Sequence, residues 1–164
     1  MKRLHVLRVL PAVMLVLFSV GIIQADTTAE NFAVYNIQGE RFIFYKMLDS
    51  MPADSTLLVN FTSVNCIPCR KELPELKSIS VSSGGSISLM CIYAETADVA
   101  GLSAESLGVA ENAYIDPFGN IQKLYNVRKY PVTFIIDKQY KILGRFEGYN
   151  ESNIKKIKQL CGVK

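Results

Sequence analysis

Three short apolar runs, each bounded by polar or turn-forming residues, mark the centre of the chain. They are TLLVNFT at 56–62, ISLMCIYA at 87–94 and YPVTFIID at 130–137. Continuous apolar runs of this length are typical of strands that are buried on both faces of a sheet. KILGRFEG at 141–148 follows the third run across the turn DKQY and is predicted to pair with it.

Helical spacing of apolar residues is found between and after these runs. Leu73, Leu76 and Ile79 recur within residues 70–80, where Pro74 is expected to kink the helix. A short amphipathic helix, IQKLYNV, is predicted after the turn DPFGN. The last helix, ESNIKKIKQLCG, is predicted to end at Gly162 and to carry its apolar face on Ile154, Ile157, Leu160 and Cys161.

Two further segments complete the predicted fold. FAVYNIQGERFIFY at 32–45 alternates apolar and polar residues around a Gln-Gly turn, as a β-hairpin does. Residues 95–111 are expected to form a helix or a partly irregular insert. The whole pattern predicts one α/β domain, with a central mixed β-sheet flanked by helices and an N-terminal β-hairpin.

The first 25 residues, MKRLHVLRVLPAVMLVLFSVGIIQA, have the layout of an export segment. Three basic residues precede an apolar run of 15 residues, and Ala25 ends a signal-type cleavage site. The run is shorter than the ~18–20 residues that a membrane-spanning helix needs, which favours a cleaved signal peptide. Ile23 stands where a small residue is preferred, so an uncleaved membrane anchor stays open. Residues 26–164 are then the exported domain.

Removal of this segment changes the charge balance. It carries three of the 18 Lys and Arg residues and none of the 15 Asp and Glu, so the exported domain balances at 15 against 15. The basic isoelectric point therefore gives no support to a nucleic-acid-binding surface. The single histidine, His5, also lies in the segment, which excludes Ser-His-Asp or Cys-His catalysis and His-ligated zinc or haem within the exported domain.

Two of the four cysteines form a Cys-x-x-Cys motif in the stretch VNCIPCRKELP, at Cys66 and Cys69. Structural zinc usually takes four ligands in two close pairs, but Cys91 and Cys161 are isolated in the sequence, so a metal site is weakly supported. A purely structural disulfide would close a very short loop, for which the gain in chain entropy is least.

The position of the motif favours redox chemistry. It follows a buried strand and opens a helix, so Cys66 is expected at the helix N-terminus, where free backbone N–H groups and the helix dipole favour a thiolate. Pro68, in the first turn, gives up only an N–H that would have no helical partner. Cys69 lies one turn further in and is expected to be less exposed, which suits it to resolving a mixed disulfide formed at Cys66.

Two blocks of the sequence resemble a known family. LLVNFTSVNCIPCRKELPEL at 57–76 is similar to the active-site strand, motif and kinked helix of the thioredoxin superfamily, in particular its extracytoplasmic TlpA/ResA-type thiol–disulfide oxidoreductases. YIDPFGNIQKLYNVRKYPVTFIIDKQYKILGRFEGY at 114–149 is similar to the last helix-strand-strand run of that family. The resemblance covers roughly residues 32–161 and implies a thioredoxin-like fold.

The resemblance also implies roles for individual residues. Cys66 and Cys69 match the attacking and resolving cysteines, which form a redox-active disulfide, and Pro131 matches the cis-proline that lies beside it. Tyr130 is then expected to offer backbone groups to a bound substrate strand. The expected substrate-binding residues are Tyr130, Pro131, Ile67 and Pro68.

Glu72 matches the last position of the Cys-x-x-Cys-x-x-Glu pattern of the ResA-type branch. It lies three residues after Cys69, on the same helical face. Thioredoxins have a buried Asp where this chain has Asn60, and an amide cannot accept the proton that Cys69 must lose. The resemblance therefore implies that Glu72 accepts that proton, and the alternative is a solvated glutamate on a helix surface.

The chain also departs from the family. Thr62 and Asn65 stand where Trp is usual, so the surface around Cys66 is expected to be more polar. Cys91 is expected to be a small buried core residue, and a Cys91–Cys161 disulfide stays open because their separation cannot be derived from the sequence.

The function predicted for this chain is disulfide exchange with protein substrates by an exported enzyme. The resemblance favours the reducing direction, as in cytochrome c maturation, with a membrane thiol reductant as electron donor. The periplasm is the expected compartment, with the domain either soluble after cleavage or anchored to the membrane. No metal or organic cofactor is expected.

Two alternative functions stay open. Ser63, three residues before Cys66, stands where peroxiredoxin-type thiol peroxidases keep a hydroxyl, although Cys69 and the Tyr130-Pro131 pair are evidence against that activity. A non-catalytic module that binds Cu(I) or a protein would use the two thiolates, because Cu(I) prefers soft sulfur ligands. No Met or His lies near the motif to complete such a copper site.

Overall fold

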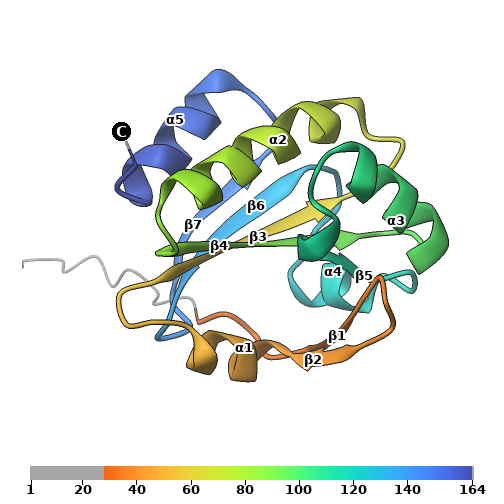
Figure 1. Ribbon diagram of the computed structural model, residues 1–164, viewed down its shortest axis with the longest axis horizontal. Coiled ribbons are helices and arrows are strands. Elements are labelled where there is room, and N and C mark those ends of the chain that lie inside the picture. Colours follow the sequence, from red (N-terminus) through yellow and green to blue (C-terminus); the bar gives the residue numbers. More distant parts are fainter. Residues whose placement is uncertain (1–27, 164) are drawn as a thin grey trace, which may run out of the picture.

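A mixed sheet of seven strands forms the centre of the structure, a computed structural model that describes residues 28–163 (Figure 1). The strands are β1 (Ala33–Asn36), β2 (Arg41–Ile43), β3 (Thr56–Thr62), β4 (Ile87–Tyr93), β5 (Ala113–Ile115), β6 (Val132–Asp137) and β7 (Ile142–Glu147). The α-helices are α1 (Phe44–Ser50), α2 (Ile67–Ser82), α3 (Ala97–Ser106), α4 (Asn120–Leu124) and α5 (Glu151–Leu160), and a 3-10 turn covers Ala110–Asn112.

The strand order across the sheet is β2-β1-β5-β4-β3-β6-β7. β3 runs parallel to β4 and antiparallel to β6, and in this register Leu58 lies opposite Leu89 on one side and Ile135 on the other. These three central strands are the three apolar runs of the sequence. β7 pairs with β6 in the antiparallel sense, as predicted for residues 141–148.

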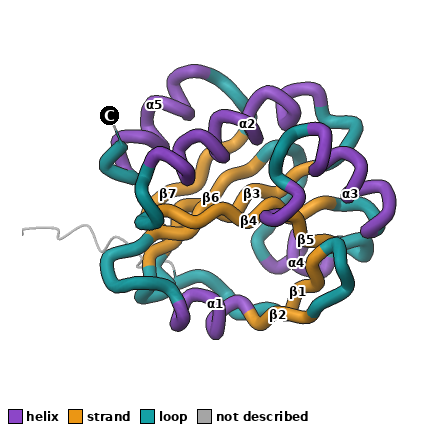
Figure 2. Tube along the Cα trace, in the orientation of Figure 1, coloured by secondary structure: helices purple, strands orange, loops and turns teal. Residues whose placement is uncertain are grey.

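Helices cover both faces of the sheet, and each face has its own apolar core. One face, beneath α2, α3 and α5, buries residues such as Leu58, Leu76 and Ile157. The other face, beneath α1 and α4, buries residues such as Val59 and Phe44. Figure 1 shows α2 and α5 above the sheet and α1 below it, and Figure 2 shows the same layers by type of element. A sheet covered in this way explains why its central strands are continuously apolar.

The topology brings several chain segments to one edge of the sheet. β3, β4 and β5 are mutually parallel and lead into α2, α3 and α4, so the residues that follow these strands meet at the same edge. β6 begins at that edge, because Val132 pairs with Phe61 near the end of β3. The Cys-x-x-Cys motif, directly after β3, and Pro131, directly before β6, are therefore neighbours in space.

The predicted hairpin at 32–45 is correct in its first part and wrong at its end. β1 and β2 pair around Gly39, which has a positive φ of 85° that suits glycine. Residues 44–50 form the helix α1 and do not continue the hairpin. The physical reason is that Phe44 and Leu48, four residues apart, both become fully buried on one face of that helix.

The helices α3 and α5 differ in part from what the sequence predicted. Residues 95–111, left between a helix and an irregular insert, contain the regular helix α3. In α5, Ile154 and Ile157 are buried as expected, but Leu160 is 50% exposed and Cys161 is only partly buried. Cys161 packs against the core from the C-cap of α5, so only Leu160 departs from the predicted apolar face.

Residues 1–25, predicted to be a signal peptide or membrane anchor, lie outside the described residues, and the boundary at residue 26 stays a prediction. Between residues 28 and 163, no helix has both the length and the apolar character needed to cross a membrane.

Candidate active site

Cys66 is the N-cap residue of α2. Its backbone is extended, with φ −87° and ψ 100°, and its Sγ accepts a hydrogen bond from the backbone N–H of Cys69 at 3.2 Å. Pro68 follows in the first turn, where a missing N–H breaks no helical hydrogen bond. The sequence therefore places this sulfur atom where helix N–H groups point, and such groups stabilise negative charge.

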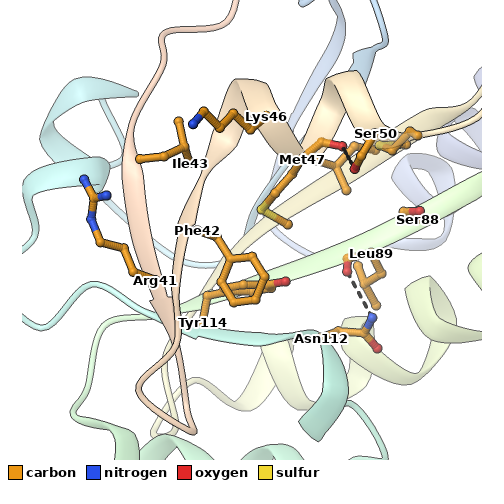
Figure 3. A pocket seen from close by; sticks show the side chains of 12 residues that line it. Arg41, Phe42, Ile43, Lys46, Met47, Ser50, Ser88, Leu89, Asn112 and Tyr114 are labelled. Atoms are coloured by element: carbon orange, nitrogen blue, oxygen red, sulfur yellow. Dashed lines mark hydrogen bonds between the residues drawn. The ribbon is translucent and has the colours of Figure 1, made fainter.

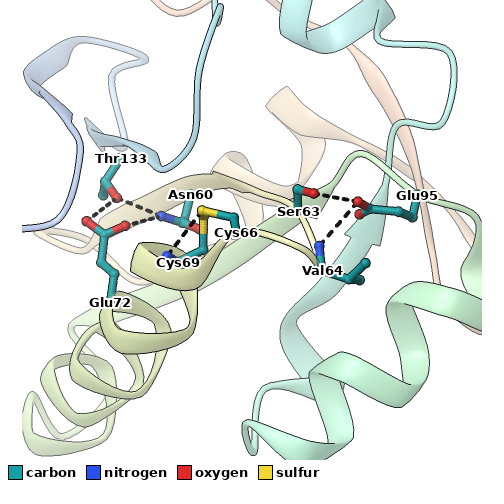
Figure 4. The surroundings of a disulfide bond; sticks show 8 residues. All are labelled: Asn60, Ser63, Val64, Cys66, Cys69, Glu72, Glu95 and Thr133. Atoms are coloured by element: carbon teal, nitrogen blue, oxygen red, sulfur yellow. Dashed lines mark hydrogen bonds between the residues drawn. A yellow bond between two sulfur atoms is a disulfide. The ribbon is translucent and has the colours of Figure 1, made fainter.

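Cys66 and Cys69 form a disulfide, with their Cα atoms 5.2 Å apart (Figure 4). The two sulfurs differ in access to solvent, because Cys66 is half-buried whereas the Cys69 residue is only 1% exposed. A large partner can thus reach Cys66 but not Cys69. This asymmetry is what the sequence predicted for an attacking and a resolving cysteine.

Pro131 lies beside the motif, and its peptide bond with Tyr130 is cis. A shallow hollow of about 440 Å³ contains Tyr130 together with Ser63, Asn65, Cys66, Ile67 and Pro68. Ile67 stands out on this surface, because 72% of it is exposed. The hollow thus brings together three of the four residues that the sequence assigned to substrate binding, and the fourth, Pro131, follows Tyr130 directly in the chain.

Glu72 is buried, with 1% of the residue exposed, so it is not a solvated helix glutamate. Its carboxylate accepts hydrogen bonds from the side-chain amide of Asn60 at 2.9 Å and from the hydroxyl of Thr133 at 3.3 Å. The Asn60 amide also donates to the Thr133 hydroxyl at 2.8 Å (Figure 4). This triad joins β3, α2 and β6, with Glu72 one helical turn after Cys69 in α2.

Burial raises the pKa of Glu72 to about 7, because the ionised carboxylate loses solvation inside the protein. The hydrogen bonds from Asn60 and Thr133 act in the opposite direction and lower this pKa, since they stabilise the charged form. A carboxyl group with a pKa near neutrality can both accept and return a proton at physiological pH.

A second carboxylate, Glu95, supports the loop before the motif. One of its oxygens accepts a hydrogen bond from the Ser63 hydroxyl at 2.6 Å and another from the Val64 backbone N–H at 3.2 Å (Figure 4). The Ser63 hydroxyl, which the sequence offered as a possible peroxidase feature, therefore donates its hydrogen bond to the Glu95 carboxylate. Neither Glu95 nor Thr133 was predicted from the sequence. Glu95 is the second residue after β4, the strand beside β3, and this position is a signal that could have indicated it.

Cys91 and Cys161 are both free thiols. Cys91 is fully buried in β4, as expected of a core residue, and the Cys91–Cys161 disulfide that the sequence left open is not formed. Burial raises the pKa of Cys161 to about 11, so this thiol carries little charge at neutral pH. Within the described part of the chain, no three His, Cys, Asp or Glu side chains gather in a way that could hold a metal ion.

The chain is similar in sequence to thiol–disulfide oxidoreductases named ResA. The chain is 26% identical to the thiol–disulfide oxidoreductase ResA of Bacillus thuringiensis over 122 residues, which covers 73% of this chain and 68% of ResA. No family model matches the sequence.

Solved structures with the same fold include one protein from Chlorobium tepidum and one from Bacillus subtilis. A protein from Chlorobium tepidum, assigned as a thiol:disulfide interchange protein DsbE, superposes with a TM-score of 0.71 at 22% identity, over 82% of this chain and 93% of that one. StoA from Bacillus subtilis superposes with a TM-score of 0.61 at 19% identity, over 80% and 96% of the two chains. The thioredoxin-like fold expected from the sequence is thereby confirmed.

Proposed function

We propose that the chain is a thiol–disulfide oxidoreductase of thioredoxin-like fold, related to ResA, and that it reduces disulfides in protein substrates outside the cytoplasm. The observation that carries the proposal is the asymmetric disulfide at the start of α2, in which Cys66 is accessible beside cis-Pro131 while Cys69 is buried.

The proposed cycle begins with both cysteines reduced. The Cys66 thiolate attacks one sulfur of a substrate disulfide, so a mixed disulfide forms and the first substrate thiolate leaves. Cys69 then loses its proton and attacks the Cys66 sulfur, which releases the second substrate thiolate and forms the Cys66–Cys69 disulfide seen in this structure. The substrate has gained two electrons, and a thiol donor must return two electrons to the enzyme.

Glu72 is proposed to accept the proton of Cys69. It follows Cys69 by one helical turn and is buried with it, so bulk water has little access to this proton. A pKa of about 7 allows the carboxylate to take the proton when Cys69 attacks and to return it when the disulfide is reduced again. Asn60 and Thr133 hold the carboxylate in place through their hydrogen bonds.

Tyr130, Pro131, Ile67 and Pro68 are proposed to bind the substrate segment that carries the disulfide. Exposed Ile67 supplies apolar contact area beside Cys66, and Tyr130 lines the same hollow. Extended peptides commonly dock through backbone hydrogen bonds, while side-chain pockets select among them.

Export and electron supply are further parts of the proposal. The basic and apolar pattern of residues 1–25 supports passage to the periplasm, with or without a retained membrane anchor. A membrane thiol reductant would then supply electrons, and apocytochrome c thiols are one substrate class that such an enzyme would keep reduced. Fractionation of cells, with detection of the protein's size, tests whether the segment is removed.

Turnover can be tested directly with the protein as it exists. Catalysed reduction of insulin disulfides by dithiothreitol is expected for the wild type, and Cys66→Ser is expected to reduce the rate to background. Cys161→Ser is the matched control, because Cys161 is a free thiol far along the chain in α5's cap. Full activity of Cys66→Ser, or peroxide consumption in place of insulin reduction, would contradict the proposal.

A further inference from the structure

A second hollow lies at the opposite end of the sheet from the cysteines. Its volume is about 680 Å³, and it is formed by β2, α1, the turn before β5 and the beginnings of β3 and β4 (Figure 3). Leu57, on its floor, is the second residue of β3, whereas Cys66 follows the end of that strand. At about 3.3 Å per residue, the five steps from Leu57 to the end of β3 alone separate the two sites by roughly 17 Å.

The interior of this hollow is apolar. Leu57 and Leu89 form a floor that belongs to the buried core, being 2% and 4% exposed. Phe42 stands edge-on to Tyr114, with ring centroids 5.5 Å apart, and these rings form one wall. Met47 lies opposite, and its flexible thioether can adapt to a ligand's shape. Volume and lining match those of small-molecule sites in proteins.

The polar groups on the inner lining are largely engaged by the protein itself. The side-chain amide of Asn112 donates to the Leu89 carbonyl at 3.1 Å and its oxygen accepts from Lys77 at 3.0 Å. The Ser50 hydroxyl donates to the Met47 carbonyl at 2.7 Å. A ligand body with many hydrogen-bonding groups would therefore find few partners in the hollow, whereas a hydrocarbon body needs none.

Two cations, Arg41 and Lys46, are the charged residues of the lining, and it contains no Asp or Glu. Both are exposed, and within residues 28–163 neither forms an ion pair or a side-chain hydrogen bond. The acids near them in sequence are engaged elsewhere, since Glu40 accepts from Asn36 and Asp49 accepts from Tyr140. Figure 3 shows the two cationic head groups on the same side, flanking Ile43.

We propose that this hollow binds a free fatty acid, with its hydrocarbon chain over Leu57 and Leu89 and its carboxylate between Arg41 and Lys46. The apolar interior accounts for the chain, and the two unpaired cations at the mouth account for the charge of the head group. This site is independent of the disulfide chemistry proposed above.

Isothermal titration of the full chain with monomeric decanoate tests the proposal. Lengthening the probe from octanoate to decanoate is expected to tighten binding about fourfold for each methylene buried. Arg41→Gln and Lys46→Gln are each expected to weaken decanoate binding by about two- to fivefold, the range typical of an exposed ion pair. Decyltrimethylammonium, with the same chain and the opposite charge, is expected to bind more weakly than decanoate.

Control variants keep the proposal falsifiable. Arg128→Gln removes an exposed cation at a distance from the hollow and is expected to leave binding unchanged. Ser88→Phe is expected to fill the hollow and abolish binding, with thermal unfolding as the check on its fold. No binding of decanoate, equal binding of the cationic probe, or unchanged binding in the double Gln variant would overturn the proposal.

Discussion

Asn60 donates its side-chain amide to the buried carboxylate of Glu72 at 2.9 Å, across the interface between β3 and α2. The two residues are twelve positions apart in the sequence. Their contact means that a neutral side chain supports the buried acid, where a second carboxylate would repel it. The charge state of Glu72 is thus set by the competition between burial and two hydrogen bonds.

The pH dependence of stability is expected to report this competition. In the oxidised protein, where neither active-site cysteine titrates, Glu72 has a pKa of about 7 when folded and an ordinary value of 4.5 when unfolded. The contribution of protonated Glu72 to the free energy of unfolding is fully present below pH 4.5. It is lost as pH rises towards 7, because Glu72 releases its proton at a lower pH in the unfolded chain than in the folded protein. The loss amounts to roughly 3 kcal/mol.

Urea unfolding at several pH values measures this loss as the difference between wild type and Glu72→Gln. The difference is expected to change by that amount between pH 4.5 and 7 and to be constant outside this window. Glu75→Gln, on the same helix but ion-paired with Lys158 at the surface, is the matched control. A difference curve that is flat across the window would show that Glu72 is not the group described.

Removal of the Asn60 amide is expected to raise the pKa of Glu72 further. Hydrogen bonds to charged groups contribute about 1.5–3 kcal/mol, which corresponds to a shift of roughly one to two pH units for Asn60→Ala. Carboxyl carbon NMR of the oxidised protein measures the titration directly. Ser63→Ala, which disturbs Glu95 and not Glu72, should leave it unchanged. An unaltered titration in Asn60→Ala would contradict the role given to this amide.

The two cysteines are expected to behave differently when each is replaced. Cys69→Ser should accumulate a mixed disulfide with substrate through Cys66, because no internal thiol remains to resolve it. Cys66→Ser should form almost none, since Cys69 is only 1% exposed. Non-reducing electrophoresis after addition of a disulfide-containing substrate separates the two outcomes. Equal trapping by both variants would mean that Cys69 is as accessible as Cys66 in solution.

Ile67 is expected to contribute to substrate affinity and not to folding. Because the residue is 72% exposed, Ile67→Ser should change the free energy of unfolding by less than about 0.5 kcal/mol. If the substrate covers this side chain, kcat/KM should fall by roughly tenfold, mostly through KM. Val81→Ser is the matched control, since Val81 is 67% exposed at the other end of the same helix. Equal effects of the two substitutions would argue against a substrate contact at Ile67.

The sequence predicted the parts of the fold that depend on local pattern. The strands containing Leu58, Leu89 and Ile135 were correctly assigned, because burial on both faces makes such segments apolar throughout. Residues 44 and 45, predicted to end the hairpin, instead begin α1, because Phe44 is compatible with either a strand or a helix, and only packing against the sheet decides between them.

The site was predicted where it depends on neighbouring residues and missed where it depends on residues far apart in the sequence. Cys66 and Cys69 form a local motif, so their placement at a helix start follows from the neighbouring residues. The support of Glu72 by Thr133 joins residues 61 positions apart, and Glu95 reaches Ser63 across 32 positions. Such contacts depend on strand order and register, which hydrophobic pattern alone does not determine.

The reduction potential of the Cys66–Cys69 pair tests most directly the proposal that this protein is a disulfide reductase. The protein would be equilibrated in glutathione or dithiothreitol buffers and its oxidised fraction measured. Cys66→Ser is the control, because this variant cannot form the Cys66–Cys69 disulfide. We expect a reversible two-electron couple near or below about −270 mV, the value of thioredoxin. A potential near about −120 mV would instead assign the chain as a disulfide donor, and the absence of any reversible couple would contradict disulfide exchange altogether.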